Sequence, residues 1–420
     1  MKFLFKINLI LFSFFGFLLS SHCSSPEMGN TLNVPSAGAT SIGTTTGNKK
    51  TDPDPPLIVG AERTDLYLDK LKGRKIGLIV NQTSIVNGSH LVDWLLAENI
   101  SVQKIFAPEH GFRGTADAGQ QIKNGKDPKT GLPIISLYGK NKKPTANQLA
   151  GLDLLIFDIQ DVGARFYTYI STMHYAMEAA AENNLDFWVF DRPNPNGHYV
   201  DGPILKPGFK SFVGLHPVPV VHGMTVGEYA QMLNGEGWLT NGVKCELTVI
   251  PCENYTHDRS YELPIKPSPN LPNAKAIYLY PSLCFLEGTT ASAGRGTNLQ
   301  FQIYGHPDYP SGDFEFKPVS MPGAKYPKHE NKLSHGYNLS KEPLSSLRKR
   351  GLDLNYLIDF YRFFPNKEAF FLKNNFFDKL AGTDVLRKDI IAGKTASEIK
   401  ASWQPELNKF LTIRNKYLMY

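Results

Sequence analysis

The chain has 420 residues, of which 41% are hydrophobic and 20% charged, a composition typical of a globular protein that excludes global disorder. This length allows two domains with cores of their own. The formal net charge of +6 is small and scattered, which argues against nucleic-acid binding and is weakly compatible with a small acidic substrate.

The N-terminus has the features of a secretion signal. Lys2 and Lys6 precede an apolar run over residues 7–19 that is too short to span a bilayer. We therefore interpret residues 1–22 as a signal peptide and expect an exported protein, either periplasmic or anchored in the outer membrane as a lipoprotein.

Cys23 is the candidate for that lipid anchor, because it follows the apolar run directly. His22 argues against it, since a small residue is expected just before a lipidated cysteine. Residues 23–56 consist largely of Ser, Thr, Gly, Asn and Pro, which predicts a flexible tether.

Residues 57–270 alternate between predicted strands and predicted helices. The strand candidates are short, apolar runs at residues 75–80, 102–106, 133–138, 154–159, 187–190, 218–221 and 246–250. Helices are expected at residues 91–98 and 168–183, and after the capping boxes that begin at Thr145 and Thr225. The alternation is typical of an α/β fold with a Rossmann-like, doubly wound parallel sheet.

The Pro-rich stretch KPSPNLPN interrupts this pattern and predicts a domain boundary after residue 270. For residues 271–420 we expect a second, smaller α/β domain. It ends in a long helix that begins after the capping box of Thr395 and Glu398.

The sequence contains no motif for a cofactor or a metal. The first predicted strand is followed by NQTSIVNGS, without the glycines of a dinucleotide site, and there is no Walker loop or nucleophile elbow. His174 and Glu178 are spaced to share a helix face, but we interpret them as an exposed polar stripe. Cys245, Cys252 and Cys284 lack zinc spacing and are expected to be buried free thiols, with a disulfide to Cys284 left open.

Polar residues follow the carboxyl ends of several predicted strands, which is where doubly wound sheets bind ligands. Two of these segments, IFAPEHGFRGTAD and DLLIFDIQDVGAR, bring carboxylates and suggest the acid/base pair of a glycosidase. Glu109 is the candidate acid, and Asp158 or Asp161 the second carboxylate. Each of the three also has a structural interpretation, as a cap or turn residue.

Further substrate-binding candidates are polar residues at the same strand ends or in the second domain: His110, Arg113, Arg165, Asp191, Arg192, His222, Glu287 and Arg295. The role of Arg165 is left open: it could orient one of the acids, bind a substrate carboxylate or form a surface ion pair. The Asp191–Arg192 turn and His222 also have purely structural interpretations.

Several short sequence motifs, separated along the chain and in a fixed order, show a resemblance to a known family. They are APEHGFRG, DAG, TGLPIISLYG, FDIQDVGARFYTYISTM, DRPNPNG, HGMTVGEYA, SPNLPN, LEGT and GRGT. Together they resemble the NamZ family of exo-β-N-acetylmuramidases. The resemblance implies a Rossmann-like domain and a C-terminal domain that closes an active-site cleft. It also implies that the family's acidic residues correspond to Glu109 and the Asp158/Asp161 segment.

The activity implied is release of terminal β-linked N-acetylmuramic acid (MurNAc) from the non-reducing end of peptidoglycan fragments such as MurNAc-GlcNAc, in cell-wall turnover or scavenging. An arginine site for the lactyl carboxylate of MurNAc is expected, and no cofactor or metal is needed. The alternatives are a surface-tethered muropeptide-binding protein without hydrolytic activity and, more weakly, a metal-dependent amidase.

Overall fold

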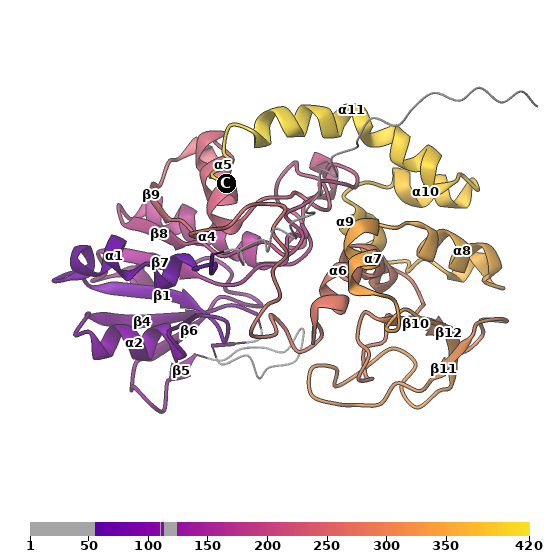
Figure 1. Ribbon diagram of the computed structural model, residues 1–420, viewed down its shortest axis with the longest axis horizontal. Helices are drawn as coiled ribbons and strands as arrows, with labels where there is room; N and C mark the ends of the chain where they lie inside the picture. The colour runs from indigo at the N-terminus through magenta and orange to yellow at the C-terminus, as the bar shows by residue number, and fades with distance from the viewer. Residues whose placement is uncertain (1–54, 110, 113–123) are drawn as a thin grey trace, which may run out of the picture. The chain divides into compact units, whose positions relative to one another are not determined.

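The structure is a computed structural model that describes residues 55–109, 111–112 and 124–420 (Figure 1). Residues 55–420 form one compact unit. The predicted signal peptide, Cys23 and nearly all of the predicted tether lie outside the described residues, as do His110 and Arg113. Within the described part, no helix combines the length and apolar content that crossing a membrane requires.

A seven-stranded sheet organises the N-terminal half of this unit (Figure 1). Its strand order is β5-β6-β4-β1-β7-β8-β9, and all pairs are parallel except that of β5 with β6. The strands are β1 (Ile76–Val80), β4 (Val102–Ala107), β5 (Gly125–Lys126), β6 (Pro133–Ser136), β7 (Leu154–Asp158), β8 (Asp186–Phe190) and β9 (Glu246–Ile250). The predicted doubly wound parallel sheet is therefore confirmed.

The apolar runs of the central strands are buried on both faces, which is why they read as continuous hydrophobic segments. In β7, Leu154 and Ile156 pack into one core, while Leu155 and Phe157 pack into the other. Alternate side chains of a strand point to opposite faces, so a single run supplies both cores. One core lies under α1 and α2; the other continues through α4 and α5 into the C-terminal half.

The helices between the strands are α1 (Thr64–Leu71), α2 (Leu91–Ala97), α3 (Ala146–Leu149), α4 (Tyr169–Glu182) and α5 (Val226–Gly235), and β2 (Ile85–Val86) pairs with β3 (Ser89–His90) in a hairpin. The capping boxes predicted at Thr145 and Thr225 are both formed. The strand predicted at residues 218–221 is wrong. That run is buried, but within it only Val221 forms isolated β-bridges, to Ala164 and Asp201. The segment therefore packs against loops and does not add a strand to the sheet.

The C-terminal half is a smaller α/β domain, as predicted (Figure 1). Its antiparallel sheet has the order β10-β12-β11, with β10 (Ile303–His306), β11 (Phe314–Phe316) and β12 (Ser334–Asn338). Its helices are α6 (Ala274–Leu283), α7 (Leu344–Arg350), α8 (Asn355–Phe363), α9 (Phe376–Ala381), α10 (Val385–Ile391) and α11 (Ala396–Arg414). The capping box of Thr395 opens α11, and the exact domain boundary at residue 270 stays a prediction.

Candidate active site

A pocket at the carboxyl edge of the sheet contains side chains from both halves of the chain. Its lining residues are Glu109, Phe166, Tyr167, Thr168, Tyr169, Ser268, Asn270, Leu271, Tyr280, Arg295 and Phe301. The chain winds from β1 outwards through β4 and β6, then returns to β7 on the other side of β1. Such a reversal opens a crevice at the strand ends, where sheets of this type bind ligands.

Glu109 reaches this pocket from the turn that follows β4. It is half-buried, and its Oε2 accepts a hydrogen bond of 3.0 Å from the hydroxyl of Thr168, the residue before α4. The neighbouring Tyr169 hydroxyl has a raised pKa, first because it is buried and second because of the negative charge on Glu109. The turn thus places a carboxylate against hydroxyl groups from the start of a helix.

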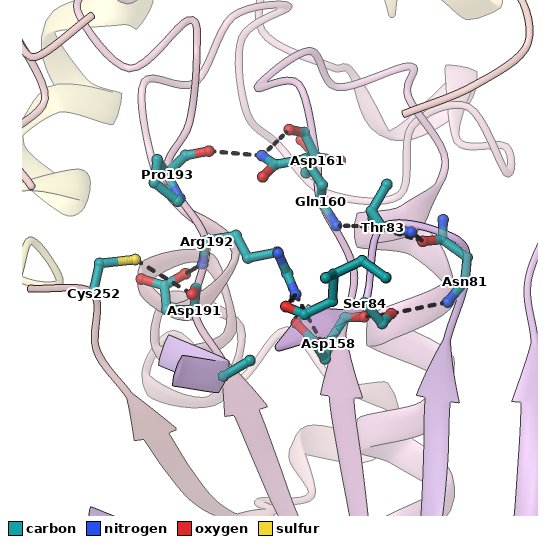
Figure 2. Close-up of polar contacts among 12 residues, drawn as sticks. Asn81, Thr83, Ser84, Asp158, Gln160, Asp161, Asp191, Arg192, Pro193 and Cys252 are labelled. Carbon is teal, nitrogen blue, oxygen red and sulfur yellow. Dashed lines mark hydrogen bonds and ion pairs between the residues drawn. The ribbon is translucent and has the colours of Figure 1, made fainter. Parts of the chain in front are cut away.

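Asp158, the last residue of β7, lies on the same edge in a fully buried ion pair with Arg192 (Figure 2). Arg192 Nε is 2.5 Å from Oδ1 and Nη2 is 2.9 Å from Oδ2. Burial acts to lower the pKa of Arg192, but the charge of Asp158 outweighs it and raises that pKa. Both carboxylate oxygens are occupied, and neither residue lines the pocket.

Asp161 lies three residues further on, and its environment is different. Its Oδ2 accepts a 2.7 Å hydrogen bond from the backbone N–H of Gly163, whereas its buried Oδ1 has no hydrogen-bond partner among the described residues. Burial raises its pKa to about 7. The charge of Asp161 also acts on the hydroxyls of Tyr167 and Tyr169, two tyrosines of the pocket wall.

Arg165 lies away from the pocket and holds backbone segments together. It is 1% exposed, and its guanidinium donates to the carbonyl oxygens of Pro203, Val218, Leu380 and Ala381 at 2.7–2.9 Å. Burial without a carboxylate partner lowers its pKa to about 9. Its two terminal nitrogens are thus directed at carbonyl oxygens of the fold.

Asp191 and His222 are also buried within the first domain. Asp191 accepts hydrogen bonds from the hydroxyls of Thr225 and Tyr420 and from the N–H of Gly227, and burial raises its pKa to about 6. His222 is 1% exposed, and burial lowers its pKa to about 3. Neither side chain lines the pocket.

Arg295, predicted to bind substrate, reaches the pocket from the second domain. Its Nε lies 3.2 Å from Oε2 of Glu287. Burial acts to raise the pKa of Glu287, but Arg295 and Lys328 hold it below its usual value. Of the predicted site residues that the structure describes, the pocket therefore brings together Glu109 and Arg295.

His174 and Glu178 are not the exposed stripe that their spacing suggested. Both are buried, with His174 Nε2 3.1 Å from Glu178 Oε1, and His174 Nδ1 lies 3.0 Å from Nε2 of His216. The described residues hold no cluster of three or more side chains suited to a metal. Cys245, Cys252 and Cys284 are buried free thiols, as expected.

Sequence reasoning about single residues missed part of the pocket wall, namely Thr168, Tyr169, Ser268 and Asn270. The first two follow a loop and begin α4, and the other two lie in the Pro-rich stretch that served only as a boundary marker. Their positions inside the blocks that carry the family resemblance were the available signal: they fall within FYTYISTM and SPNLPN.

Comparisons with known proteins agree with this architecture. Two family models match the chain: "Exo-beta-N-acetylmuramidase NamZ, N-terminal" over residues 76–275, and its C-terminal counterpart over residues 278–420. The chain is 40% identical over 372 residues to the "Peptidoglycan beta-N-acetylmuramidase NamZ" of Bacillus subtilis (strain 168), covering 84% of this chain and 89% of that protein.

Two crystal structures of DUF1343 family proteins from Bacteroides fragilis NCTC 9343 are similar to it. One has a TM-score of 0.81 and 51% sequence identity, the other a TM-score of 0.76 and 28% identity, and each comparison covers 87% of this chain and 99% of the other. The shared fold, the two matching domains and the curated relative lead to one conclusion. The chain belongs to the NamZ family of exo-β-N-acetylmuramidases.

Proposed function

We propose that this protein is an exo-acting glycoside hydrolase that releases terminal β-linked MurNAc from the non-reducing end of peptidoglycan fragments, in cell-wall turnover or scavenging. The name of the 40% identical relative supports the reaction and the substrate. The observation that carries the proposal for this chain is the placement of Glu109 in a pocket to which the second domain contributes Arg295.

Glu109 is the general acid of this proposal. Glycoside hydrolysis needs a carboxyl group that protonates the departing oxygen while the bond to the anomeric carbon breaks. Glu109 is half-buried, and the Thr168 hydroxyl fixes one of its oxygens. A carboxyl group held in this way keeps a constant orientation towards the glycosidic oxygen during the reaction.

For the second carboxyl group we favour Asp161 over Asp158. Asp158 is engaged at both oxygens by Arg192, and releasing it would leave a buried arginine without its partner. Asp161 does not line the pocket either, but its charge acts on Tyr167 and Tyr169 of the pocket wall. One of its oxygens has no partner among the described residues, and burial raises its pKa to about 7, which is suited to proton transfer near neutral pH.

Arg295 is the residue we propose for the lactyl carboxylate of MurNAc. Arg165 and Arg192 are buried and occupied by carbonyl groups and by Asp158, respectively. The guanidinium of Arg295 lines the pocket, with its Nε 3.2 Å from Oε2 of Glu287, and its terminal nitrogens are the groups we propose for the carboxylate. The planar guanidinium group is well suited to bind a carboxylate through two parallel hydrogen bonds.

We further propose export through a signal peptide at residues 1–22 and membrane attachment through a lipidated Cys23. The apolar run after Lys2 and Lys6 supports export. Fractionation of the producing cells is the test: wild-type protein is expected with membranes, and Cys23→Ala in the soluble exported fraction. Equal distribution of both proteins would contradict the anchor.

The activity is tested with two disaccharides of opposite order. Purified protein is expected to release MurNAc from MurNAc-GlcNAc and to leave GlcNAc-MurNAc intact, because only the first presents MurNAc at its non-reducing end. Chromatography of the products decides the outcome. Tight binding of MurNAc-GlcNAc without any released MurNAc would instead identify a muropeptide-binding protein.

A further inference from the structure

Between β11 and β12 the chain makes a long excursion (Figure 1). This segment carries exposed apolar side chains. Six large hydrophobic residues are strongly exposed within the described part of the chain, and three of them lie here: Val319, Tyr326 and Leu333. Tyr326 is 82% exposed, the highest value of the six.

One end of the segment around Tyr326 is tied to the pocket wall. The side-chain amide of Asn270, a lining residue, donates a 2.8 Å hydrogen bond to the carbonyl oxygen of Gly323. Gly323 has φ +89° and packs so closely that an added Cβ would lie 2.6 Å from Cβ of Pro269. A side chain at this position would therefore push the segment away from the pocket wall.

The other end is tied to the loop that carries Arg295. Lys328 donates to four backbone carbonyl oxygens, among them that of Glu287, the partner of Arg295, at 3.1 Å. Pro327 packs against Gly296, where an added Cβ would lie 2.7 Å from the proline ring. Both anchors thus involve residues on or next to the pocket wall.

Tyr326 lies between these two anchors. It is three residues from Gly323 and directly precedes Pro327, and three residues span at most about 10 Å even when extended. The ammonium group of Lys325 lies over the tyrosine ring, 5.6 Å from its centroid. This cation favours one face of the ring and leaves the opposite face for another partner.

We propose that Tyr326 is the stacking platform for the sugar on the leaving-group side of the scissile bond, the GlcNAc of MurNAc-GlcNAc. This inference rests on the proposed hydrolase function. A pyranose ring presents a face of C–H groups that packs on an aromatic ring, and a tyrosine provides that surface at low cost in conformational entropy. Tyr326 therefore determines how strongly the enzyme prefers a sugar as leaving group.

The test compares two substrates that differ only in the leaving group: MurNAc-GlcNAc, and β-MurNAc fluoride, whose leaving group is a single atom. Tyr326→Ala is expected to lower kcat/KM about tenfold on the disaccharide, which corresponds to about 1.4 kcal/mol. On the fluoride its kcat/KM should stay within about twofold of wild type, since no sugar occupies the platform.

Two further variants make the comparison specific. Tyr326→Phe keeps the ring and is expected to behave as wild type on both substrates. Phe363→Ala removes another exposed aromatic side chain, on α8, and is expected to change neither rate.

Three results would overturn the inference: equal loss on both substrates in Tyr326→Ala, no loss on the disaccharide, or a loss in Tyr326→Phe as large as in Tyr326→Ala. Failure of the proposed function gives a different result, because wild-type protein would then release MurNAc from neither substrate.

Discussion

Arg165 donates a 2.7 Å hydrogen bond to the backbone carbonyl of Ala381, 216 residues further along the chain. The same guanidinium also binds Leu380 O, at the end of α9, and Val218 O, in the first domain. One buried side chain therefore connects the loops of the first domain with a helix end of the second. The relative position of the two halves affects the pocket, because Glu109 and Arg295 come from different halves.

We predict that Arg165→Met destabilises the protein by about 3 kcal/mol or more, because several buried carbonyl groups lose their donor. Urea unfolding followed by circular dichroism measures the change. Arg362→Met, at an exposed position on α8, is the control and should leave the midpoint unchanged. A variant with normal stability and a raised KM would instead place Arg165 in substrate binding.

The Asp158–Arg192 pair leads to a second prediction about stability. Arg192→Met is expected to cost about 3–5 kcal/mol, because it leaves the Asp158 carboxylate buried without a partner. The double variant Asp158→Asn/Arg192→Met should lose less than the sum of the two single changes, since no charge is then stranded. Unfolding of all four proteins completes the cycle.

The exposed pair of Lys72 and Asp69 is the control for this cycle. Asp69→Asn should produce no measurable change in the unfolding midpoint, because solvent screens that pair. Additive losses at Asp158 and Arg192 would show that the two side chains stabilise the fold independently, contrary to the geometry.

The sheet was predictable from the sequence because its physical cause is local. A strand buried on both faces must be apolar almost throughout, and β1 and β7 satisfy this within a few consecutive residues. The run at residues 218–221 is also apolar and buried, but it contains Pro219, which cannot donate to a strand ladder, and Val221 bridges only to loop residues among those described. The capping boxes were predictable for the same reason: their partners are three residues apart.

The functions of the charged residues were not predictable in this way, because their partners are distant in the sequence. Nothing near Arg165 indicates the carbonyl of Ala381, and nothing near Asp158 indicates which arginine will pair with it. In the sequence alone, Asp158 and Asp161 cannot be distinguished as candidates for the second carboxylate. Only the structure shows that Asp158 is bound at both oxygens, whereas Asp161 Oδ1 has no partner in the part of the chain that the structure describes.

Asp161 gives a prediction about pH. Burial raises its pKa from 3.8 to about 7 in the folded protein. Between these values the folded state binds more protons than the unfolded state, so its contribution to stability is complete below about pH 4 and is lost as the pH rises through about 7. The slope contributed by this one group is at most about 1.4 kcal/mol per pH unit.

Asp161→Asn should remove that slope. We expect the free energy of unfolding of wild type relative to Asp161→Asn to fall between pH 4 and pH 7 and to level off above it, with urea titrations at each pH as the measurement. Asp191, whose pKa is also raised, is present in both proteins, so its contribution cancels in the comparison. Parallel pH profiles for the two proteins would contradict the raised pKa of Asp161.

Glu109 carries the proposed chemistry, and Glu109→Gln tests it directly. The amide has nearly the same shape and still accepts a hydrogen bond from Thr168, but it cannot supply a proton to the leaving oxygen. We expect turnover on a chromogenic MurNAc glycoside to fall by about two to four orders of magnitude, the usual contribution of general acid/base catalysis. The unfolding midpoint should be unchanged, and Glu98→Gln, at an exposed position after α2, should keep full activity.

Because a fluoride leaving group needs little protonation, the loss on β-MurNAc fluoride should be much smaller than on the glycoside. An equal loss on both substrates would assign Glu109 to substrate positioning, and wild-type turnover on the glycoside would remove it from the mechanism.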